Sequence, residues 1–272
     1  LEADPQTKVI AVISKPPGAK TLARLVEHFK TCAKPVIGCF LGVRAEIKNT
    51  DTFQRAATID EAVRLAVKII GGETASNETA FTPAELELIS QEKAAWGFEQ
   101  KYLRGLFAGG TFCYQSQQIF RDAGIVVHSN APLESKYKLA DSHRSLEHAV
   151  VDMGADEYTV GKPHPMIDGT QRKQRILTEA RDPQTAILLL DFILGYNASM
   201  DPVGELLDAI IEAKKIAQKH GGYLSVVASI CGTDGDPQDL NLQSRMLREA
   251  GVIVFNSNAR AAIFCSELLK GI

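Results

Sequence analysis

The sequence lacks several features by which function is often recognised at first sight. Its 272 residues carry a formal charge of only −3, without the basic excess that nucleic-acid binding requires, so we expect no nucleic acid as a partner. The longest apolar run, AILLLDFIL at 186–194, is too short to span a bilayer and contains Asp191, so we expect no membrane. The five cysteines are scattered and form no CxxC pair, which is typical of reduced thiols in a cytoplasmic protein.

Signatures of catalysis are missing as well. The chain contains no Walker loop, no GxGxxG fingerprint, no recognisable catalytic triad and no second histidine at ligand spacing from His164. We therefore expect no metal site, and these residues imply no cofactor. Hydrophobic residues at 45% and charged residues at 23% are ordinary values for a globular chain with a buried core.

What the sequence does contain is a regular alternation of apolar strands and amphipathic helices from residue 101 onward. We predict strands at 103–108, 148–152, 186–191, 223–230 and 252–255. Helices are predicted at 111–123, 169–181, 203–219, 238–250 and 258–269. Continuous apolar strands alternating with helices favour a parallel sheet covered on both faces, so the fold class is α/β and flavodoxin-like. In such a sheet, ligands bind at the carboxyl ends of the strands.

The first part of the chain repeats this pattern in shortened form. Strands are predicted at 8–13 and 35–41, and helices at 18–32 and 59–70. LEADPQTKVIAVISK at 1–15 resembles TEARDPQTAILLLDF at 178–192, with an identical DPQT. We interpret residues 1–72 as the incomplete back half of a second copy of the domain, residues 73–100 as a linker and residues 101–272 as the full copy. Because two strands and two helices bury little surface, we expect the sequence to be the carboxyl-terminal piece of a longer polypeptide.

The loop after the strand at 103–108 is rich in glycine and reads GLFAGGTF. Gly109 and Gly110 allow a ligand to approach the backbone, and Thr111 can cap the following helix. Free N–H groups and the helix dipole at such a place favour an anion. A tight turn without any ligand is an equally good interpretation.

The stretch GKPHPMIDGTQRKQR at 161–175 follows the next strand end. Two prolines bracket His164 and restrict the backbone there to extended conformations, which suits either a presented catalytic group or a stiff corner. Asp168 is a good N-cap for the next helix. Arg172 and its basic neighbours lie where the helix dipole disfavours positive charge, and a bound anion would compensate that cost. Lys162 and Arg172 are therefore candidate anion ligands, with solvated side chains on an exposed face as the alternative.

Further candidates lie at the other strand ends. Asp191 closes an otherwise apolar strand, so it is either paired or has a raised pKa. The remaining candidate binding residues are small or polar groups at strand ends: Asp152, Gly154, Gly195, Asn197, Gly232 and Thr233, and Ser14 and Lys15 in the partial copy.

Taken together, these stretches resemble the FdrA family, whose members are similar to succinyl-CoA synthetase with α-like and β-like modules fused in one polypeptide. The resemblance is carried by DPQTKVIAVISKPP (4–17), KPVIGCFLG (34–42), RGLFAGGTFC (104–113), VDMGADEYTVGKPHPMID (151–168), LLLDFILGYNASMDPVG (188–204) and GTDGDPQ (232–238). It implies succinyl-CoA synthetase-type ligase domains, with residues 1–72 as the end of the α-like one and 101–272 as the β-like one. It also implies an upstream module through which CoA or a nucleotide would bind.

One part of the family's pattern is missing. Succinyl-CoA synthetases carry a phosphohistidine in a Gly-His-Ala-Gly-Ala loop after the strand that matches PVIGCFLG. Here that segment, VRAEIKNTDTFQRAA at 43–57, contains no histidine. In those enzymes two helix N-termini, one from each such domain, face the phosphohistidine. This agrees with the anion sites inferred at Gly109–Thr111 and at the helix after Asp168.

Three functional hypotheses follow. The leading one is carbamoyl- or acyl-phosphate group transfer, like the oxamate carbamoyltransferase of allantoin breakdown with which FdrA-type proteins are associated. In it, His164 polarises a carbonyl or moves a proton, Asp168 or Asp191 orients it, and the anion ligands named above hold the phosphate. The alternatives are an acyl-CoA synthetase subunit that forms a CoA thioester, and a non-catalytic scaffold. The resemblance implies a small carboxylate or phosphate ligand and a homo-oligomer or a complex with partner subunits.

Overall fold

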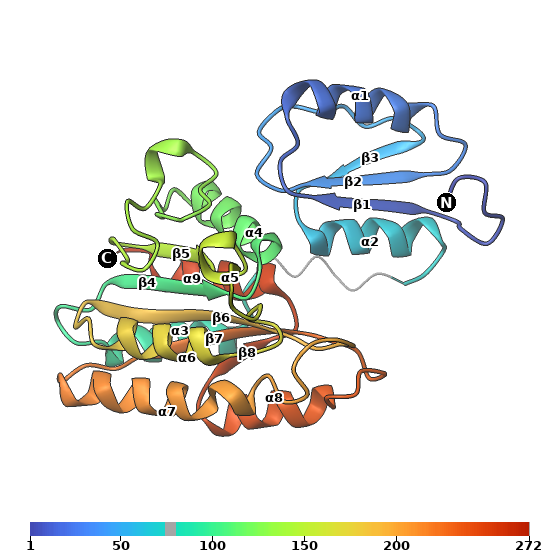
Figure 1. Ribbon diagram of the computed structural model, residues 1–272. Helices are drawn as coiled ribbons and strands as arrows, with labels where there is room; N and C mark the ends of the chain where they lie inside the picture. Colours follow the sequence, from blue (N-terminus) through green and yellow to red (C-terminus); the bar gives the residue numbers. More distant parts are fainter. Residues whose placement is uncertain (74–79, 272) are drawn as a thin grey trace. The chain divides into compact units, whose positions relative to one another are not determined.

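The chain folds into two compact units, Leu1–Phe81 and Thr82–Ile272 (Figure 1). The computed structural model describes residues 1–73 and 80–271. Each unit contains a parallel β-sheet with helices on both of its faces, which confirms the predicted α/β fold class. Among the described residues, no helix combines the length and the apolar character needed to cross a membrane.

The sheet of the first unit has three parallel strands in the order β1-β2-β3. Along the chain its elements are β1 Ile10–Ser14, α1 Ala19–Lys30, β2 Val36–Phe40, β3 Phe53–Ala56 and α2 Ile59–Ile69. In the core beneath α1, Phe29 stacks on Phe53 with 5.9 Å between the ring centroids. The sequence pattern does not predict β3, because its four residues, FQRA, are too few and too mixed to show a strand period.

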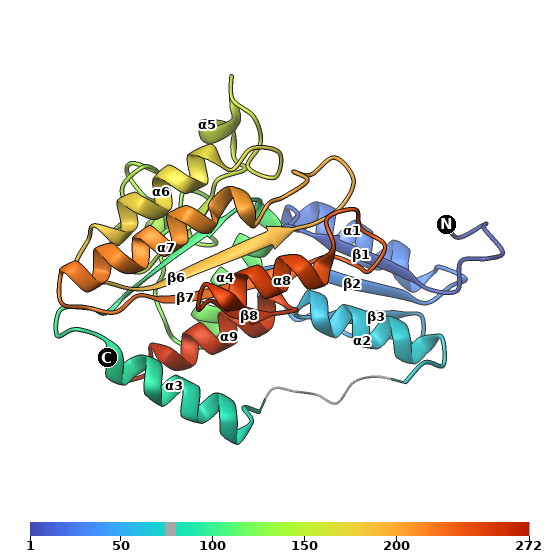
Figure 2. The same cartoon turned by 90° about the horizontal axis from the view of Figure 1, so that it is seen from below.

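The second unit has a five-stranded parallel sheet in the order β5-β4-β6-β7-β8, as in flavodoxin-like folds. Its strands are β4 Tyr102–Phe107, β5 Ala149–Asp152, β6 Thr185–Ile193, β7 Ser225–Cys231 and β8 Ile253–Phe255. Its helices are α3 Pro83–Ala95, α4 Gly110–Asp122, α5 Asp156–Thr159, α6 Thr170–Ala180, α7 Gly204–Lys219, α8 Leu240–Glu249 and α9 Asn258–Leu268, with a 3-10 turn at Ser135–Tyr137. Helices α6, α7 and α8 cover one face of the sheet, and α4 and α9 cover the other (Figure 2).

The repeat in the sequence is also a repeat in topology. The order β1-β2-β3 of the first unit matches the order β6-β7-β8 of the second. Strand β6 lies between β4 and β7 and is almost wholly buried, whereas no strand among the described residues pairs with the outer edge of β1. Accordingly, β1 alternates between half-buried and exposed positions, and Ile13 is 43% exposed.

The structure differs from the predicted linker over residues 73–100, of which 74–79 lie outside the described residues. Helix α3 belongs to the second unit and begins with a capping box formed by Thr82 and Glu85. Glu85 also pairs with Arg260 of α9 at 2.7 Å, and the indole of Trp96 donates to the Ser225 hydroxyl at 2.8 Å. Helix α3 has no one-sided apolar stripe, so its packing could not be predicted from hydrophobic spacing, and polar contacts hold it in place instead.

Candidate functional site

Several of the predicted site residues of the second unit lie where β4, β5 and β6 end. The strand order changes direction between β4 and β6, so the connections after these two strands leave on opposite faces of the sheet. The parallel register places Phe107 of β4 beside Asp152 of β5, and Leu106 beside Leu190, the residue before Asp191. The two aspartates therefore flank the carboxyl end of β4.

Helix α4 starts directly after β4. Gly109 occupies the N-cap position with an extended backbone, and no side chain among the described residues caps the helix. The first turn contains no acidic residue, and Thr111 is exposed. A Cβ atom on Gly109 would lie 3.2 Å from the terminal methyl of Met166, so glycine also allows the 161–168 loop to approach closely. These features leave the positive end of the α4 dipole for a ligand.

Asp191 and Arg172 form a buried ion pair beneath this helix end. The guanidinium of Arg172 donates to the Asp191 carboxylate at 2.9 Å and to the backbone carbonyls of Leu106 and Asp191 at 2.9 and 2.8 Å. The same carboxylate accepts a hydrogen bond from the Ala108 N–H at 2.8 Å. Both side chains are almost fully buried, and burial raises the pKa of Asp191 and lowers the pKa of Arg172, while each charge opposes the shift of the other.

This pairing changes the interpretation of Arg172. We predicted it as an anion ligand whose charge is unfavourable in the first turns of a helix. In the structure the compensating anion is Asp191, and the hydrogen bonds of the guanidinium go to protein groups. Asp191, in turn, orients Arg172 and the end of β4.

The N-terminus of α6 is held by carboxylates of the chain itself. The Gly169 N–H donates to Glu205 at 2.7 Å, and the Thr170 N–H donates to Asp168 at 2.7 Å. Glu205 also accepts a hydrogen bond from the Ser199 hydroxyl, so its position is fixed from two sides. The cap position is Gly169, one residue after the predicted Asp168, although the Asp168 carboxylate still serves the helix. Hydrogen bonding to Thr170 lowers the pKa of Asp168.

His164 lies in a tight corner, and its ring is directed at neighbouring strand ends. Its carbonyl accepts from the N–H groups of Ile167 and Asp168 at 2.8 and 3.1 Å, which makes a tight corner. Its half-buried ring points at Gly154: a Cβ atom there would lie 2.7 Å from Nε2 and 2.7 Å from the Ala108 carbonyl oxygen. The Asp152 carboxylate, which accepts from the Gly154 N–H at 3.0 Å, lies on the same side. The ring is thus both held and directed at the end of β4.

The other predicted residues lie at other strand ends or form hydrogen bonds with neighbouring loop and helix residues. Lys162 is exposed and its ammonium donates to Gln171 at 3.4 Å. Gly195 and Asn197 have positive φ, and Gly195 exchanges hydrogen bonds with the Gln238 amide. At the end of β7, Thr233 donates to Asp236, and Gly232 packs against Leu194. In the first unit, the Ser14 hydroxyl donates to the Lys15 carbonyl at 2.7 Å.

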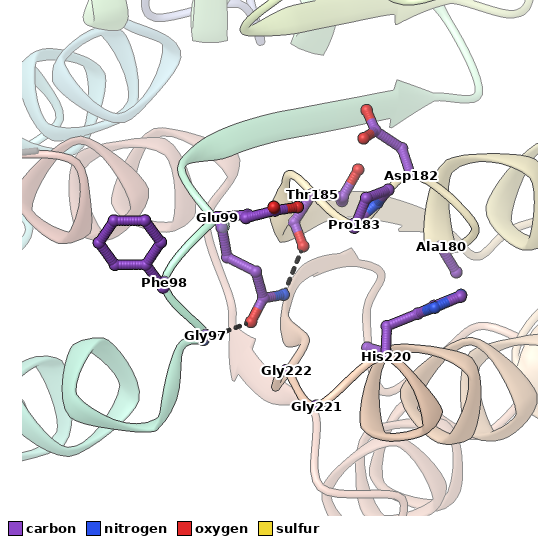
Figure 3. A pocket seen from close by; sticks show the side chains of 12 residues that line it. Gly97, Phe98, Glu99, Ala180, Asp182, Pro183, Thr185, His220, Gly221 and Gly222 are labelled. Carbon is purple, nitrogen blue, oxygen red and sulfur yellow. Dashed lines mark hydrogen bonds between the residues drawn. The ribbon is translucent and has the colours of Figure 1, made fainter.

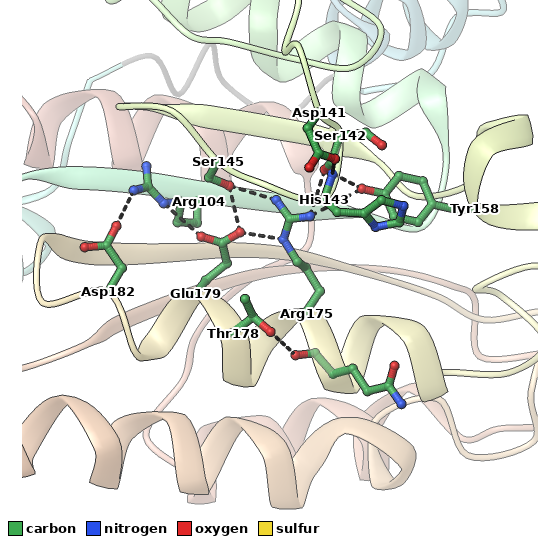
Figure 4. Close-up of polar contacts among 11 residues, drawn as sticks. Arg104, Asp141, Ser142, His143, Ser145, Tyr158, Arg175, Thr178, Glu179 and Asp182 are labelled. Carbon is green, nitrogen blue, oxygen red and sulfur yellow. Dashed lines mark hydrogen bonds and ion pairs between the residues drawn. The ribbon is translucent and has the colours of Figure 1, made fainter.

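A buried polar network that we did not predict links α5 and α6, the helices on either side of the 161–168 loop (Figure 4). Glu179 of α6 pairs with Arg104 of β4 at 3.0 Å and with Arg175 at 2.5 Å. Arg175 also donates to the Ser142 carbonyl at 2.8 Å, and the Tyr158 hydroxyl donates to the same carbonyl at 2.6 Å. The network therefore ties α5, just before the loop, to α6, just after it. The i,i+4 spacing of Arg175 and Glu179 is a sequence signal for part of it.

A cavity of about 260 Å³ lies at the opposite, amino-terminal edge of the sheet (Figure 3). Its wall comes from the segments that precede β4, β6 and β7. Gln100 fastens these segments together: its amide donates to the carbonyls of Thr185 and Tyr223 and accepts from the N–H groups of Gly97 and Tyr223. The cavity is thus separate from the candidate site by the length of the strands.

The comparisons with known proteins agree with this fold. The model of the CoA-ligase family matches residues 106–266, which is more than half of the chain and includes the end of β4, α4 and the paired Arg172 and Asp191. The chain belongs to the CoA-ligase family. Over 271 residues, or 99% of this chain, it is 39% identical to the uncharacterized protein YahF of Escherichia coli (strain K12). The chain spans about half of that relative, 52% of its length.

A solved structure is also similar at low identity. It is the dinucleotide-forming acetyl-coenzyme A synthetase 1 of Candidatus Korarchaeum cryptofilum in complex with phosphate and ADP, with 16% identity and a TM-score of 0.42. The match covers 98% of this chain and 53% of that one.

These findings bear on the predicted family and function. The succinyl-CoA synthetase-like character is confirmed at the level of the CoA-ligase domain, whereas the narrower resemblance to the FdrA family stays a prediction. The family match does not support the leading hypothesis of carbamoyl transfer. It favours the alternative, acyl-CoA ligase chemistry.

Proposed function

We propose that the second unit binds the phosphate group of an acyl phosphate at the N-terminus of α4, as part of acyl-CoA ligase chemistry. One observation carries this proposal: two helices start at the same edge of the sheet, and they differ. The N-terminus of α6 already holds Glu205 and Asp168, whereas α4 begins with Gly109 and Gly110 and has no acid in its first turn. Membership of the CoA-ligase family supports the same assignment.

In the proposed reaction, the N-terminus of α4 would stabilise the departing phosphate. When a thiolate sulfur attacks the acyl carbon of an acyl phosphate, a C–S bond forms, the C–O bond to the phosphate breaks, and the electron pair leaves with inorganic phosphate. Fixed N–H donors and a helix dipole stabilise the charge on those phosphate oxygens without reorganisation. We assign this role to the N–H groups of Gly110 and Thr111.

His164 is assigned the donation of a hydrogen bond rather than the removal of a proton. Its Nδ1 accepts from the Met166 N–H at 3.3 Å, so the proton of the neutral ring lies on Nε2. Nε2 is the nitrogen directed at Gly154 and the end of β4. It is therefore placed to donate to an oxygen of a ligand bound at α4.

The proposal is tested by titrating the full chain with acetyl phosphate, inorganic phosphate, carbamoyl phosphate and CoA in a calorimeter. Thr111→Asp adds a carboxylate to the first turn of α4 and should weaken phosphate binding about 5- to 30-fold, which corresponds to about 1–2 kcal/mol. Thr111→Asn is the neutral control. Thr170→Asp, at the already occupied N-terminus of α6, should change the affinity less than twofold, roughly 0.4 kcal/mol.

Each outcome of this titration has a meaning. Binding that is insensitive to Thr111→Asp, or sensitive to Thr170→Asp, contradicts the assignment to α4. Carbamoyl phosphate bound in strong preference to acetyl phosphate, with no binding of CoA, would favour carbamoyl transfer. A chain that binds none of the four compounds supports the scaffold hypothesis.

A further inference from the structure

The first unit brings together three side chains that are typical metal ligands and come from two distant parts of the sequence. Glu2, His28 and Cys32 each place a ligand atom so that all three atoms lie within 4.8 Å of one another. Glu2 and His28 are exposed, and Cys32 is buried at the rim of the core beneath α1. From the sequence we expected no metal site, because no second histidine stands at ligand spacing from His164.

The backbone holds the two ligands of the α1 region on one face. Helix α1 ends at Lys30, but Thr31 keeps a right-handed helical conformation, and the Cys32 N–H still donates to the Phe29 carbonyl. His28 and Cys32 therefore keep the i,i+4 relation that places two helical side chains above one another. This spacing is the one by which two ligands on a helix reach a single metal ion.

The segment that carries Glu2 is also held in position. One carboxylate oxygen of Glu2, Oε1, accepts a hydrogen bond from the Ala33 N–H at 2.6 Å. Lys34 donates to the Leu1 carbonyl at 3.1 Å and also to the Asp4 carbonyl. These contacts hold residues 1–4 beside residues 33–34, and this places the Glu2 carboxylate next to His28 and Cys32.

We propose that Glu2, His28 and Cys32 form a binding site for a divalent cation of the zinc class. A thiolate and an imidazole are borderline-to-soft ligands that select Zn²⁺ over Mg²⁺ or Ca²⁺, and the carboxylate completes a set whose two negative charges balance the ion. Donor atoms around a tetrahedral Zn²⁺ are about 3.5 Å apart, so small rotations of the two exposed side chains close the cluster. Water would take the fourth position.

Binding requires the loss of one proton from Cys32. The ion replaces that proton: an S–metal bond forms as the S–H bond breaks, and one proton goes to solvent. The site is in the first unit and does not depend on the function proposed for the second.

The test uses the full chain and Co²⁺ as a spectroscopic substitute for Zn²⁺. Co²⁺ should bind one to one, produce a thiolate-to-cobalt charge-transfer band in the near ultraviolet, release one proton and be displaced by Zn²⁺. Cys32→Ser and His28→Gln should abolish the band. Glu2→Gln, at an exposed position where folding is not at risk, should weaken binding by about tenfold or more.

Matched controls come from the second unit. Cys231 is an exposed thiol and His220 an exposed imidazole, so Cys231→Ser and His220→Gln should leave the titration unchanged. Circular dichroism confirms that each variant is folded. The proposal is wrong if no charge-transfer band develops, if the band survives Cys32→Ser, if it disappears with Cys231→Ser, or if Glu2→Gln binds Co²⁺ as tightly as the unaltered chain.

Discussion

Replacing Arg172 by methionine tests whether this residue stabilises the fold or holds an anion. The substitution keeps an unbranched apolar stem but leaves Asp191 buried without its cation, with side chains only 4% and 1% exposed in the native pair. Two backbone carbonyls, those of Leu106 and Asp191, also lose a donor. Removing one partner of a buried ion pair costs about 3–5 kcal/mol, so the second unit should lose that much stability.

A double-mutant cycle measures how much of this loss in stability comes from the pairing of Arg172 with Asp191. Asp191→Asn keeps the acceptor for the Ala108 N–H but leaves the Arg172 guanidinium buried without its anion, and should also cost about 3–5 kcal/mol. Because the double variant carries neither buried charge, it should be more stable than the sum of the single losses predicts, by about 1–3 kcal/mol. Urea unfolding followed by the fluorescence of Trp96 is the assay. Trp96 is the one tryptophan of the chain, and its indole N–H donates a hydrogen bond to Ser225 of β7.

Two results would refute this reasoning. If the effects of the two substitutions simply add, Arg172 and Asp191 do not stabilise each other in the folded state. If Arg172→Met retains the stability of the unaltered chain but loses affinity for inorganic phosphate, Arg172 is an anion ligand, as its position in the sequence indicated, and the ion pair is incidental.

Two further predictions use the same urea assay. Burial, with a smaller contribution from Arg104, lowers the pKa of His148 to about 4. As the pH falls, the unfolded chain therefore takes up a proton on His148 before the folded chain does. The free energy of unfolding should decrease by about 1–2 kcal/mol, discounted for solvent access, as the pH falls from about 6.5 to 4. His148→Gln should flatten that dependence and His220→Gln should not; a profile unchanged by the first variant contradicts the assignment. Glu205→Ala should cost about 1–2 kcal/mol because Gly169 loses its acceptor, and Glu205→Gln less than half of that. Equal losses would mean that charge, not hydrogen bonding, is what α6 requires.

Much of the architecture follows from the sequence because buried parallel strands and amphipathic helices leave strong periodic patterns. The predicted strand at 186–191 and helix at 203–219 agree with β6 and α7 to within two residues. Two elements were not predicted as they occur: β3 has only four residues, and α3 lies within the stretch that we interpreted as a linker. The predicted strand ends of the second unit agree with the structure to within two residues, whereas the functional role of the residues at those ends stays a prediction.

By itself, the sequence determined the α/β alternation, the internal repeat and the glycine-rich start of α4, because each of these is a local property of the chain. Only the tertiary structure decided what each charged group faces. Glu205 reaches the N-terminus of α6 across 36 positions of sequence, and Asp191 meets Arg172 across 19. Glu2 meets His28 and Cys32 in the same way. A charge is favourable or costly according to the groups within a few ångströms of it, and packing brings those groups together from distant parts of the chain.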